Sequence, residues 1–171
     1  MRDVLVMATA VAAAAIVVWM RQRQRQHPPE SPRAVPLPRR FGLIGGLSPA
    51  STVDYYKLIN KGVYARLGGR HSAELLMWSC DMHPVVEAEF GGDWARVGEY
   101  LAVAGRALQR AGCEGLVVAC NSVHEETAFA CLRRAVSIPI LHIAEVTADA
   151  LLRSGARRYG RGRHRGACYV G

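Results

Sequence analysis

The sequence predicts an α/β fold in which helices flank an open, mostly parallel sheet, together with an N-terminal hydrophobic helix. From Arg40 to Gly155, short apolar runs alternate with amphipathic stretches, as in chains that form β–α–β units. The run Gly115–Cys120 is apolar throughout, which is typical of a strand buried on both faces of a parallel sheet. Residues 4–20 are a longer apolar run without charge, which indicates a helix of a different kind.

The N-terminal region divides into an apolar segment and a linker. Residues 4–20 are just long enough to span a bilayer, and arginines at positions 21, 23 and 25 supply a positive flank. Residues 1–25 are therefore either a membrane anchor, with the following domain facing the cytoplasm, or a leader that does not enter the membrane. Residues 26–39 are rich in proline, which predicts a linker without regular structure.

The first β–α–β unit is predicted over residues 41–80. Phe41–Gly46 is expected to be a strand that runs into a glycine turn. Ser48–Leu67 is expected to be a helix, because Ser48 suits an N-cap and the following proline suits the first helical position. A pair of glycines ends this helix, and Ala73–Cys80 is expected to form the second strand.

The next part of the chain repeats this pattern. A helix is predicted over Trp94–Ala111, with Gly112 as its stop. Its apolar stripe comprises Trp94, Val97, Leu101, Ala104, Leu108 and Ala111. Gly115–Cys120 is the third strand, and Asn121-Ser122 is the expected cap of a helix that runs to about Arg134.

A fourth strand and a last helix complete the predicted domain, which covers residues 40–155. Ile138–Ile143 is expected to form the strand and Ala144–Ser154 the helix. A fifth strand is due next, yet residues 156–171 are rich in arginine and glycine and cannot bury a strand face. We expect a shifted reading frame or a truncated gene at this point, and the alternative is a solvated basic tail.

Charge and composition argue against several classes of function. The net charge of +8 divides into +5 over residues 1–40, −3 over 41–152 and +6 over 153–171, which argues against a nucleic-acid-binding domain. The five cysteines include no CxxC pair and no histidine at zinc-finger spacing, so neither a disulfide framework nor a metal site is predicted. Lys57 and Lys61 fit one solvated helix face, which argues against a pyridoxal cofactor.

Polar turns follow the first three strands and are expected to meet at the carboxyl edge of the sheet, where ligands bind in open α/β folds. These turns are Gly45–Pro49, Cys80-Asp81 and Cys120–His124. Cys120 precedes a predicted helix, whose positive pole would lower its pKa and make it a thiolate base. The alternative is a buried structural cysteine. Asn121 and Ser122 suit either the binding of a carboxylate or simple helix capping.

Other polar residues near this edge have structural interpretations. The glycine turn lacks the Lys-Ser/Thr pair of a P-loop and the third glycine of a dinucleotide fingerprint, so no nucleotide site is predicted. Asp81 is expected to cap the next segment, and the alternative is that it orients a substrate amine. Cys80 is expected to fill core space close to the edge. His124 and His142 are expected to serve packing rather than metal binding or base catalysis.

Four segments in fixed order carry a family resemblance. They are FGLIGGLSPASTVDYY at 41–56, GG at 68–69 with HSAE at 71–74, CNSVH at 120–124, and SIPILHI at 137–143. Through about residues 41–155 the chain resembles the aspartate/glutamate racemases. The resemblance implies an isomerase that needs no cofactor or metal and is built from two similar α/β domains. Two catalytic thiols, one from each domain, then lie on opposite faces of the substrate α-carbon.

The resemblance also implies roles for individual residues. Cys120 matches the catalytic thiol of the first domain. Asn121 and Ser122 match the pair that holds the substrate α-carboxylate, and Leu47 stands where many members have a methionine beside the ligand. The implied binding partner is a small amino acid of the aspartate or glutamate class.

The family's second domain, whose Gly-Cys-Thr-Glu motif carries the other thiol, is not recognised in this sequence, and Cys168 does not lie in such a motif. We therefore expect a PLP-independent, two-thiol amino-acid racemase of which this chain holds half the site. The alternatives are a catalytically inactive remnant or a weak acidic-amino-acid-binding module, and a membrane-tethered module if residues 4–20 insert. Apolar surface left uncovered would favour a homo-oligomer.

Overall fold

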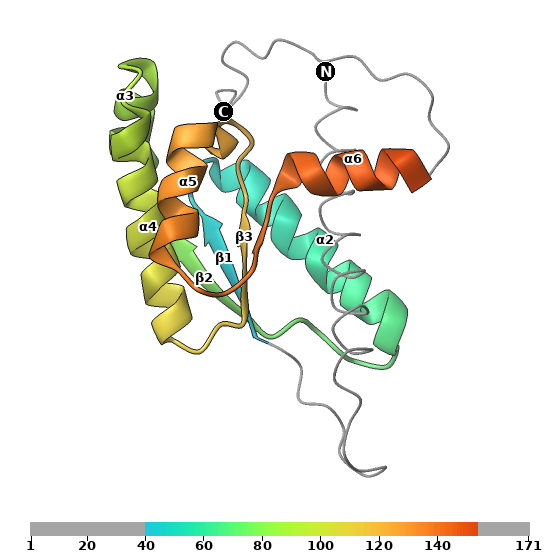
Figure 1. Ribbon diagram of the computed structural model, residues 1–171. Helices are drawn as coiled ribbons and strands as arrows, with labels where there is room; N and C mark the ends of the chain where they lie inside the picture. Colours follow the sequence, from blue (N-terminus) through green and yellow to red (C-terminus); the bar gives the residue numbers. More distant parts are fainter. Residues whose placement is uncertain (1–39, 154–171) are drawn as a thin grey trace.

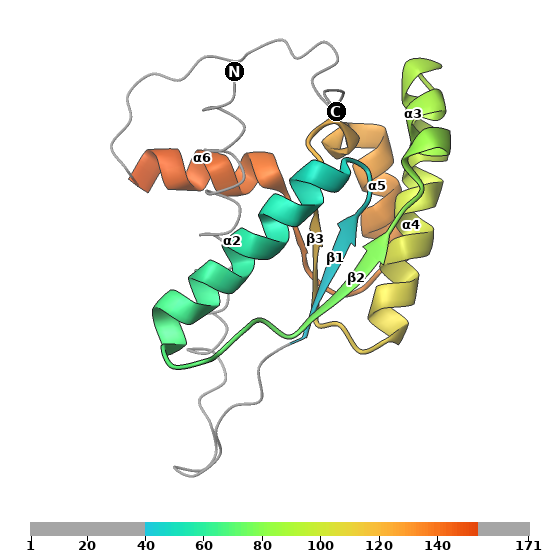
Figure 2. The ribbon, with the colours of Figure 1, turned by 180° about the vertical axis from the view of Figure 1, so that it is seen from behind.

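A computed structural model describes residues 40–153, which form a four-stranded sheet between two layers of helices. Helices α2 and α6 lie on one face of the sheet, and α3, α4 and α5 lie on the other (Figures 1 and 2). The predicted α/β class is confirmed. The apolar segment 4–20, the linker 26–39 and the basic segment 156–171 lie outside the described residues. Within residues 40–153, no helix is both long and apolar enough to cross a membrane.

All four strands are parallel, in the order β2-β1-β3-β4. The central strand β1 (Phe41–Gly45) pairs with β2 (Leu75–Ser79) on one side and with β3 (Gly115–Val118) on the other. The short strand β4 (Ile140–Leu141) completes the edge beside β3. Because the strands are parallel, their carboxyl ends meet at one edge, where the polar turns were expected to converge.

Helix α2 spans Pro49–Leu67, as predicted. Ser48 caps it by accepting a hydrogen bond from the backbone N–H of Ser51, and Gly68 follows its last turn with a positive φ of 68°. One face of α2 is buried on the sheet, whereas Lys57 and Lys61 lie on the exposed face. The prediction of a solvated lysine pair is confirmed.

Helix α3 (Met82–Phe90) was not predicted from the sequence. Asp81 begins it, because its carboxylate accepts a hydrogen bond from the backbone N–H of His83 at 3.1 Å. This confirms the capping role expected of Asp81. Pro84 is tolerated because it lies in the first helical turn, where a backbone N–H has no partner within the helix.

Helix α4 (Trp94–Arg110) follows its predicted bounds closely and buries the expected stripe, except that Ala111 is exposed beyond the helix end. The later elements differ more from the predictions. A three-residue 3-10 turn, η1 (Ser122–His124), comes before α5 (Glu126–Ala135), so the helix does not start at Asn121-Ser122. Strand β4 has two residues, and α6 (Ile143–Arg153) starts one residue earlier than expected.

Two apolar clusters hold the layers together, one on each face of the sheet. The larger cluster joins Ile44, Leu116 and Val118 to helices α3, α4 and α5. The smaller cluster packs Tyr55 and Ile59 of α2 against Leu43 and other strand residues. Because β3 contributes to both clusters, it is buried on both faces, as its continuous apolar sequence predicted.

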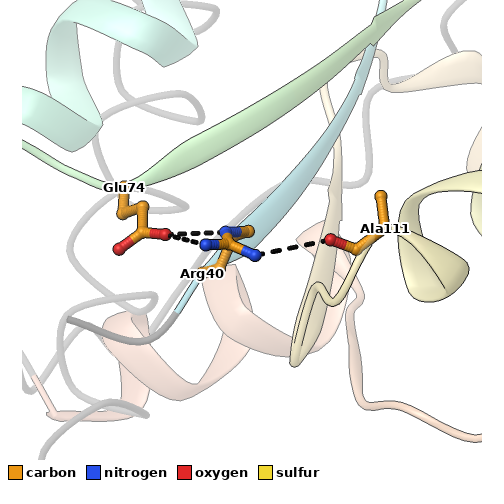
Figure 3. Close-up of polar contacts among 3 residues, drawn as sticks. All are labelled: Arg40, Glu74 and Ala111. Carbon is orange, nitrogen blue, oxygen red and sulfur yellow. Dashed lines mark hydrogen bonds and ion pairs between the residues drawn. The ribbon is translucent and has the colours of Figure 1, made fainter. Parts of the chain in front are cut away.

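The opposite, amino-terminal edge of the sheet is tied by Arg40 (Figure 3). Its guanidinium binds the Glu74 carboxylate, with Nε and one terminal nitrogen 2.6 and 2.5 Å from the same oxygen. Another terminal nitrogen lies 3.5 Å from the carbonyl oxygen of Ala111. One side chain therefore links the starts of β1 and β2 to the end of α4, away from the polar turns.

Candidate active site

The turn after β1 builds one wall of the carboxyl edge. Gly46 has a positive φ of 81°, and a Cβ there would clash with the carbonyl oxygen of Cys80. The hydroxyl of Thr52 accepts a hydrogen bond from the Gly46 N–H and donates one to the Ser48 carbonyl, each at 2.9 Å. Only glycine allows the two turns to approach this closely, so the turns after β1 and β2 form one continuous edge.

Cys120 lies two residues beyond the end of β3, at this edge. Its side chain is 4% exposed and belongs to the apolar cluster that also contains Leu47 and Val123. The Sγ atom lies 3.4 Å from the hydroxyl oxygen of Ser122, which in turn lies 3.2 Å from a carboxylate oxygen of Glu89. A thiol, a hydroxyl and a carboxylate thus form a connected chain of polar contacts at the edge.

The helix that was expected to act on Cys120 starts further along the chain. Asn121 makes no side-chain cap within the described residues. The carboxylate of Glu125 instead accepts hydrogen bonds from the N–H groups of Thr127 and Ala128, at 2.8 and 3.1 Å. Glu125 therefore caps α5, and the predicted helix start at Asn121-Ser122, directly after Cys120, is wrong. The activated thiolate at Cys120 stays a prediction.

His124 supports the turn that carries Cys120. Its Nδ1 lies 2.7 Å from the carbonyl oxygen of Cys120, and since a carbonyl only accepts, Nδ1 donates the hydrogen bond. The ring stacks on Phe129 at 5.0 Å between centroids and meets the edge of His142 at 4.8 Å. Burial, with His142 nearby, lowers the pKa of His124 to about 4, so the imidazole is neutral at pH 7. These contacts place both histidines in packing roles.

Tyr55 approaches the site from the other face of the sheet. Its hydroxyl is buried and has no hydrogen-bond partner among residues 40–153. Burial raises the pKa of Tyr55 well above its usual range, and negative charge on the nearby Cys120 raises it further. The phenol is therefore a neutral donor buried close to Cys120.

The structure brings Cys120, Ser122 and Leu47 into one region, whereas Asn121 is exposed beside them. Glu89 was missed in the sequence, since the segment that carries it showed no helical signal strong enough to predict α3. Cys80 is partly buried at the edge, and burial raises its pKa to about 11. Cys113 is buried, and Cys131 packs its sulfur against Gly98 of α4.

Comparison with known proteins adds family information to this geometry. The family described as Asp/Glu/hydantoin racemase matches residues 44–160. A candidate Asp/Glu racemase from Yersinia pestis, solved by crystallography, is 38% identical with a TM-score of 0.65, covering 68% of this chain and 50% of that chain. An aspartate racemase homologue from Pyrococcus horikoshii OT3 is 28% identical with a TM-score of 0.60, at the same coverages of 68% and 50%. The chain thus spans about half the length of both structures.

Proposed function

Because the chain belongs to the Asp/Glu/hydantoin racemase family, we propose that it forms one half of a cofactor-independent racemase site, in which Cys120 transfers a proton at the α-carbon of an acidic amino acid. The observation that carries the proposal is the position of Cys120. Its thiol lies beyond the end of the central strand β3, within the residues matched to the family, next to the hydroxyl of Ser122. A thiol at this edge is placed where ligands bind in open α/β folds.

The proposed chemistry uses two thiols. A thiolate on one face of the α-carbon takes the α-proton, and the electron pair of the C–H bond remains on the carbon, stabilised by the adjacent carboxyl group. A thiol on the opposite face then gives its proton to the carbon, which inverts the configuration. The reaction is balanced without an oxidant or a cofactor, because one proton leaves and another arrives.

The second thiol has to come from the opposite side of the substrate. Cys80 belongs to the same edge as Cys120, and its pKa of about 11 makes it a poor source of thiolate. Cys113 precedes β3, at the far edge of the sheet, and Cys131 lies on α5. In the proposal, the second thiol therefore belongs to another α/β half, as the family resemblance implies.

The proposal keeps Asn121 and Ser122 as the pair that holds the substrate α-carboxylate. Asn121 is exposed at the edge and can offer its amide to a ligand. Ser122 donates its hydroxyl proton to Glu89 and would have to turn to the substrate. Leu47, which is 3% exposed, would form part of the apolar floor beside Cys120.

The proposal is tested by α-hydrogen exchange. The full chain is incubated with L-aspartate or L-glutamate in heavy water, and loss of the α-proton signal and formation of the D-isomer are measured. We expect α-deuteration that disappears in Cys120→Ser and persists in the control Cys131→Ser, which alters a thiol on α5. Absence of exchange in the unmodified chain, or equal exchange in Cys120→Ser, would contradict the proposal.

A second candidate function is weak binding of an acidic amino acid without turnover. It is favoured by the fact that the chain spans about half the length of the two matched structures. A titration with L-aspartate, followed by changes in the amide signals of Asn121 and Ser122, separates the two candidates. Binding without α-deuteration supports the second candidate, whereas exchange supports the first.

A further inference from the structure

Cys120, Ser122 and Glu89 are contributed by three different parts of the fold. Cys120 lies beyond β3, Ser122 begins η1, and Glu89 lies in the last turn of α3. The distances of 3.4 Å between Sγ and the hydroxyl oxygen, and of 3.2 Å between that oxygen and the Glu89 carboxylate, make one continuous chain. Helix α3 therefore brings the Glu89 carboxylate to the site, and no sequence motif predicted that carboxylate there.

The direction of the hydrogen bonds in this chain follows from the number of protons. A carboxylate only accepts hydrogen bonds, so Ser122 donates its hydroxyl proton to Glu89. A hydroxyl has one proton, so its oxygen then acts as an acceptor toward Cys120. The geometry of the contact between sulfur and oxygen allows either atom to be the donor. With the hydroxyl proton given to Glu89, the proton of this contact is assigned to sulfur, so that S–H donates to the serine oxygen.

We propose that Glu89, acting through Ser122, holds Cys120 as a protonated thiol in the substrate-free protein, so that Cys120 is the proton donor of the pair. This inference rests on the proposed function. The S–H bond breaks, its proton forms the new C–H bond, and its electron pair remains on sulfur. The opposite thiol must then begin as the thiolate, which decides the enantiomer on which the resting protein first acts.

The charge of Glu89, like the hydrogen bonds, favours the protonated form of the Cys120 thiol. A thiolate beside a carboxylate is disfavoured by like-charge repulsion, and a thiolate whose neighbouring hydroxyl proton is already donated elsewhere lacks that stabilising hydrogen bond. Substrate binding would relieve the second restraint, because an incoming α-carboxylate competes with Glu89 for the proton of Ser122. Ser122 and Glu89 are therefore positioning residues, and Cys120 is the catalytic residue.

Three other titratable groups near Cys120 are neutral at pH 7. Tyr55 approaches from α2 as a neutral phenol, and His124 in η1 is a neutral imidazole that donates to the Cys120 carbonyl. Cys80 follows β2 and, with a pKa of about 11, is a neutral thiol at pH 7. From α4 and α5, the apolar side chains of Val97 and Phe129 join the same cluster.

The test is the titration profile of Cys120 in the full chain, labelled with ¹³C at the cysteine Cβ atoms. The Cβ chemical shift of each cysteine is followed by NMR between pH 6 and 10, a measurement that needs no reagent to reach a thiol that is only 4% exposed. Glu89→Gln keeps a hydrogen-bond acceptor but removes the charge. We expect it to move the Cys120 profile down by about one pH unit, with a several-fold larger thiolate fraction at pH 7.

Three variants serve as comparisons. Glu87→Gln removes another carboxylate of α3, one that pairs with the exposed His83, and is expected to leave the profile unchanged. Ser122→Ala removes the hydroxyl and is expected to lower the profile by a smaller amount, because Glu89 keeps its charge. In Ser122→Thr the retained hydroxyl is expected to restore the original profile. The dispersion of the amide signals reports folding in every sample.

An unchanged or raised profile in Glu89→Gln, with the fold retained, overturns the inference. A raised profile in Ser122→Ala also overturns it, because Ser122 would then be a donor to the thiolate. The titration needs no substrate, so this result is independent of α-hydrogen exchange. A shifted profile without α-hydrogen exchange would support the role of Glu89 and contradict the proposed function. An unchanged profile with α-hydrogen exchange would support the proposed function and contradict the role of Glu89.

Discussion

At the scale of single residues, His124 shows how packing fixes a protonation state. The ring lies between Phe129 and His142, and Nδ1 is committed to the Cys120 carbonyl. Adding a proton would place a positive charge in a buried space beside a second imidazole, which explains the pKa of about 4. The neutral imidazole therefore holds the backbone of the thiol without adding charge to the site.

This burial predicts a pH-dependent stability. Between about pH 6.5 and pH 4 the unfolded chain binds a proton at His124 and the folded chain does not, so the free energy of unfolding falls as the pH falls through this range. The expected loss is about 3 kcal/mol. Urea unfolding at several pH values measures it. His124→Asn, which can still donate to the Cys120 carbonyl, is expected to remove the larger part of this loss.

The control for this prediction is His83→Asn, because His83 is exposed on α3. It is expected to leave the pH dependence unchanged. His142 contributes in the same direction, since burial also lowers its pKa. Equal pH dependence in the unmodified chain and in His124→Asn would show that the imidazole is already protonated or exposed in the folded state.

The position of an individual residue could be predicted from the sequence where its neighbours along the chain determine that position. Cys120 could be placed at the carboxyl edge because it ends a continuous apolar strand, and Asp81 could be assigned as a cap because it begins a new segment. Glu89 could not be found in this way. Its contact with Ser122 depends on how α3 packs over the edge, which no local pattern encodes.

At the scale of elements, the turn after β1 is the most constrained connection in the described structure. Gly46 has a positive φ, and a Cβ there would clash with the backbone oxygen of Cys80 and lie 2.6 Å from its backbone nitrogen. The Cys80 nitrogen is held in place by the hydrogen bond that it donates to the Gly45 carbonyl, at 2.8 Å. This turn therefore fixes how the loops after β1 and β2 meet.

Gly46→Ala is expected to destabilise the domain by about 3 kcal/mol, the sum of an unfavourable φ and a clash with backbone. Gly92→Ala is the matched comparison, because Gly92 also has a positive φ, of 72°, but apart from Gly92 itself and its two chain neighbours no described residue has a heavy atom within 4 Å of the position that a Cβ would take there. It is expected to cost about 1 kcal/mol. Denaturant titration of both variants measures the difference, and equal costs would show that the close approach is unimportant.

The bounds of helices and strands were predicted most accurately where the local sequence signals, such as caps and apolar faces, are strongest. Helices α2 and α4 have clear caps and apolar faces, and both were predicted within one or two residues. The start of α5 was wrong because Asn121 and Ser122 suit a cap as well as Glu125 does, and the choice depends on the 3-10 turn between them. The fourth strand was predicted too long, because an apolar sequence does not reveal how many residues find a partner strand.

At the scale of the whole molecule, apolar side chains are exposed between α2 and the edge strand β2. A groove of about 320 Å³ lies between α2 and the edge strand β2, lined by the exposed Val53 and Tyr56 from the helix and by Met77 from the strand. Edge strands with apolar side chains favour association with other chains. The described domain therefore presents a surface suited to self-association.

We expect the full chain to associate at micromolar concentration, as measured by size-exclusion chromatography with light scattering. The double variant Tyr56→Ser/Met77→Thr is expected to shift the distribution toward monomer, because it makes the groove polar. Phe90→Ser is the control, since Phe90 is an exposed aromatic side chain on α3, away from the groove. A monodisperse monomer for the unmodified chain would contradict the prediction.

The order of the strands has a consequence for the time course of folding. Strand β1 pairs with β2, the next strand along the chain, and with β3, whose Gly115 lies opposite Phe41. The segments α2, β2, α3 and α4 lie between β1 and β3 in the sequence. Closing such a long loop is slow compared with forming helices and local pairs. During synthesis on the ribosome, one edge of β1 therefore stays unpaired until the apolar strand β3 has been synthesised. An unpaired strand edge can aggregate, so we expect chaperone binding to matter most in this interval.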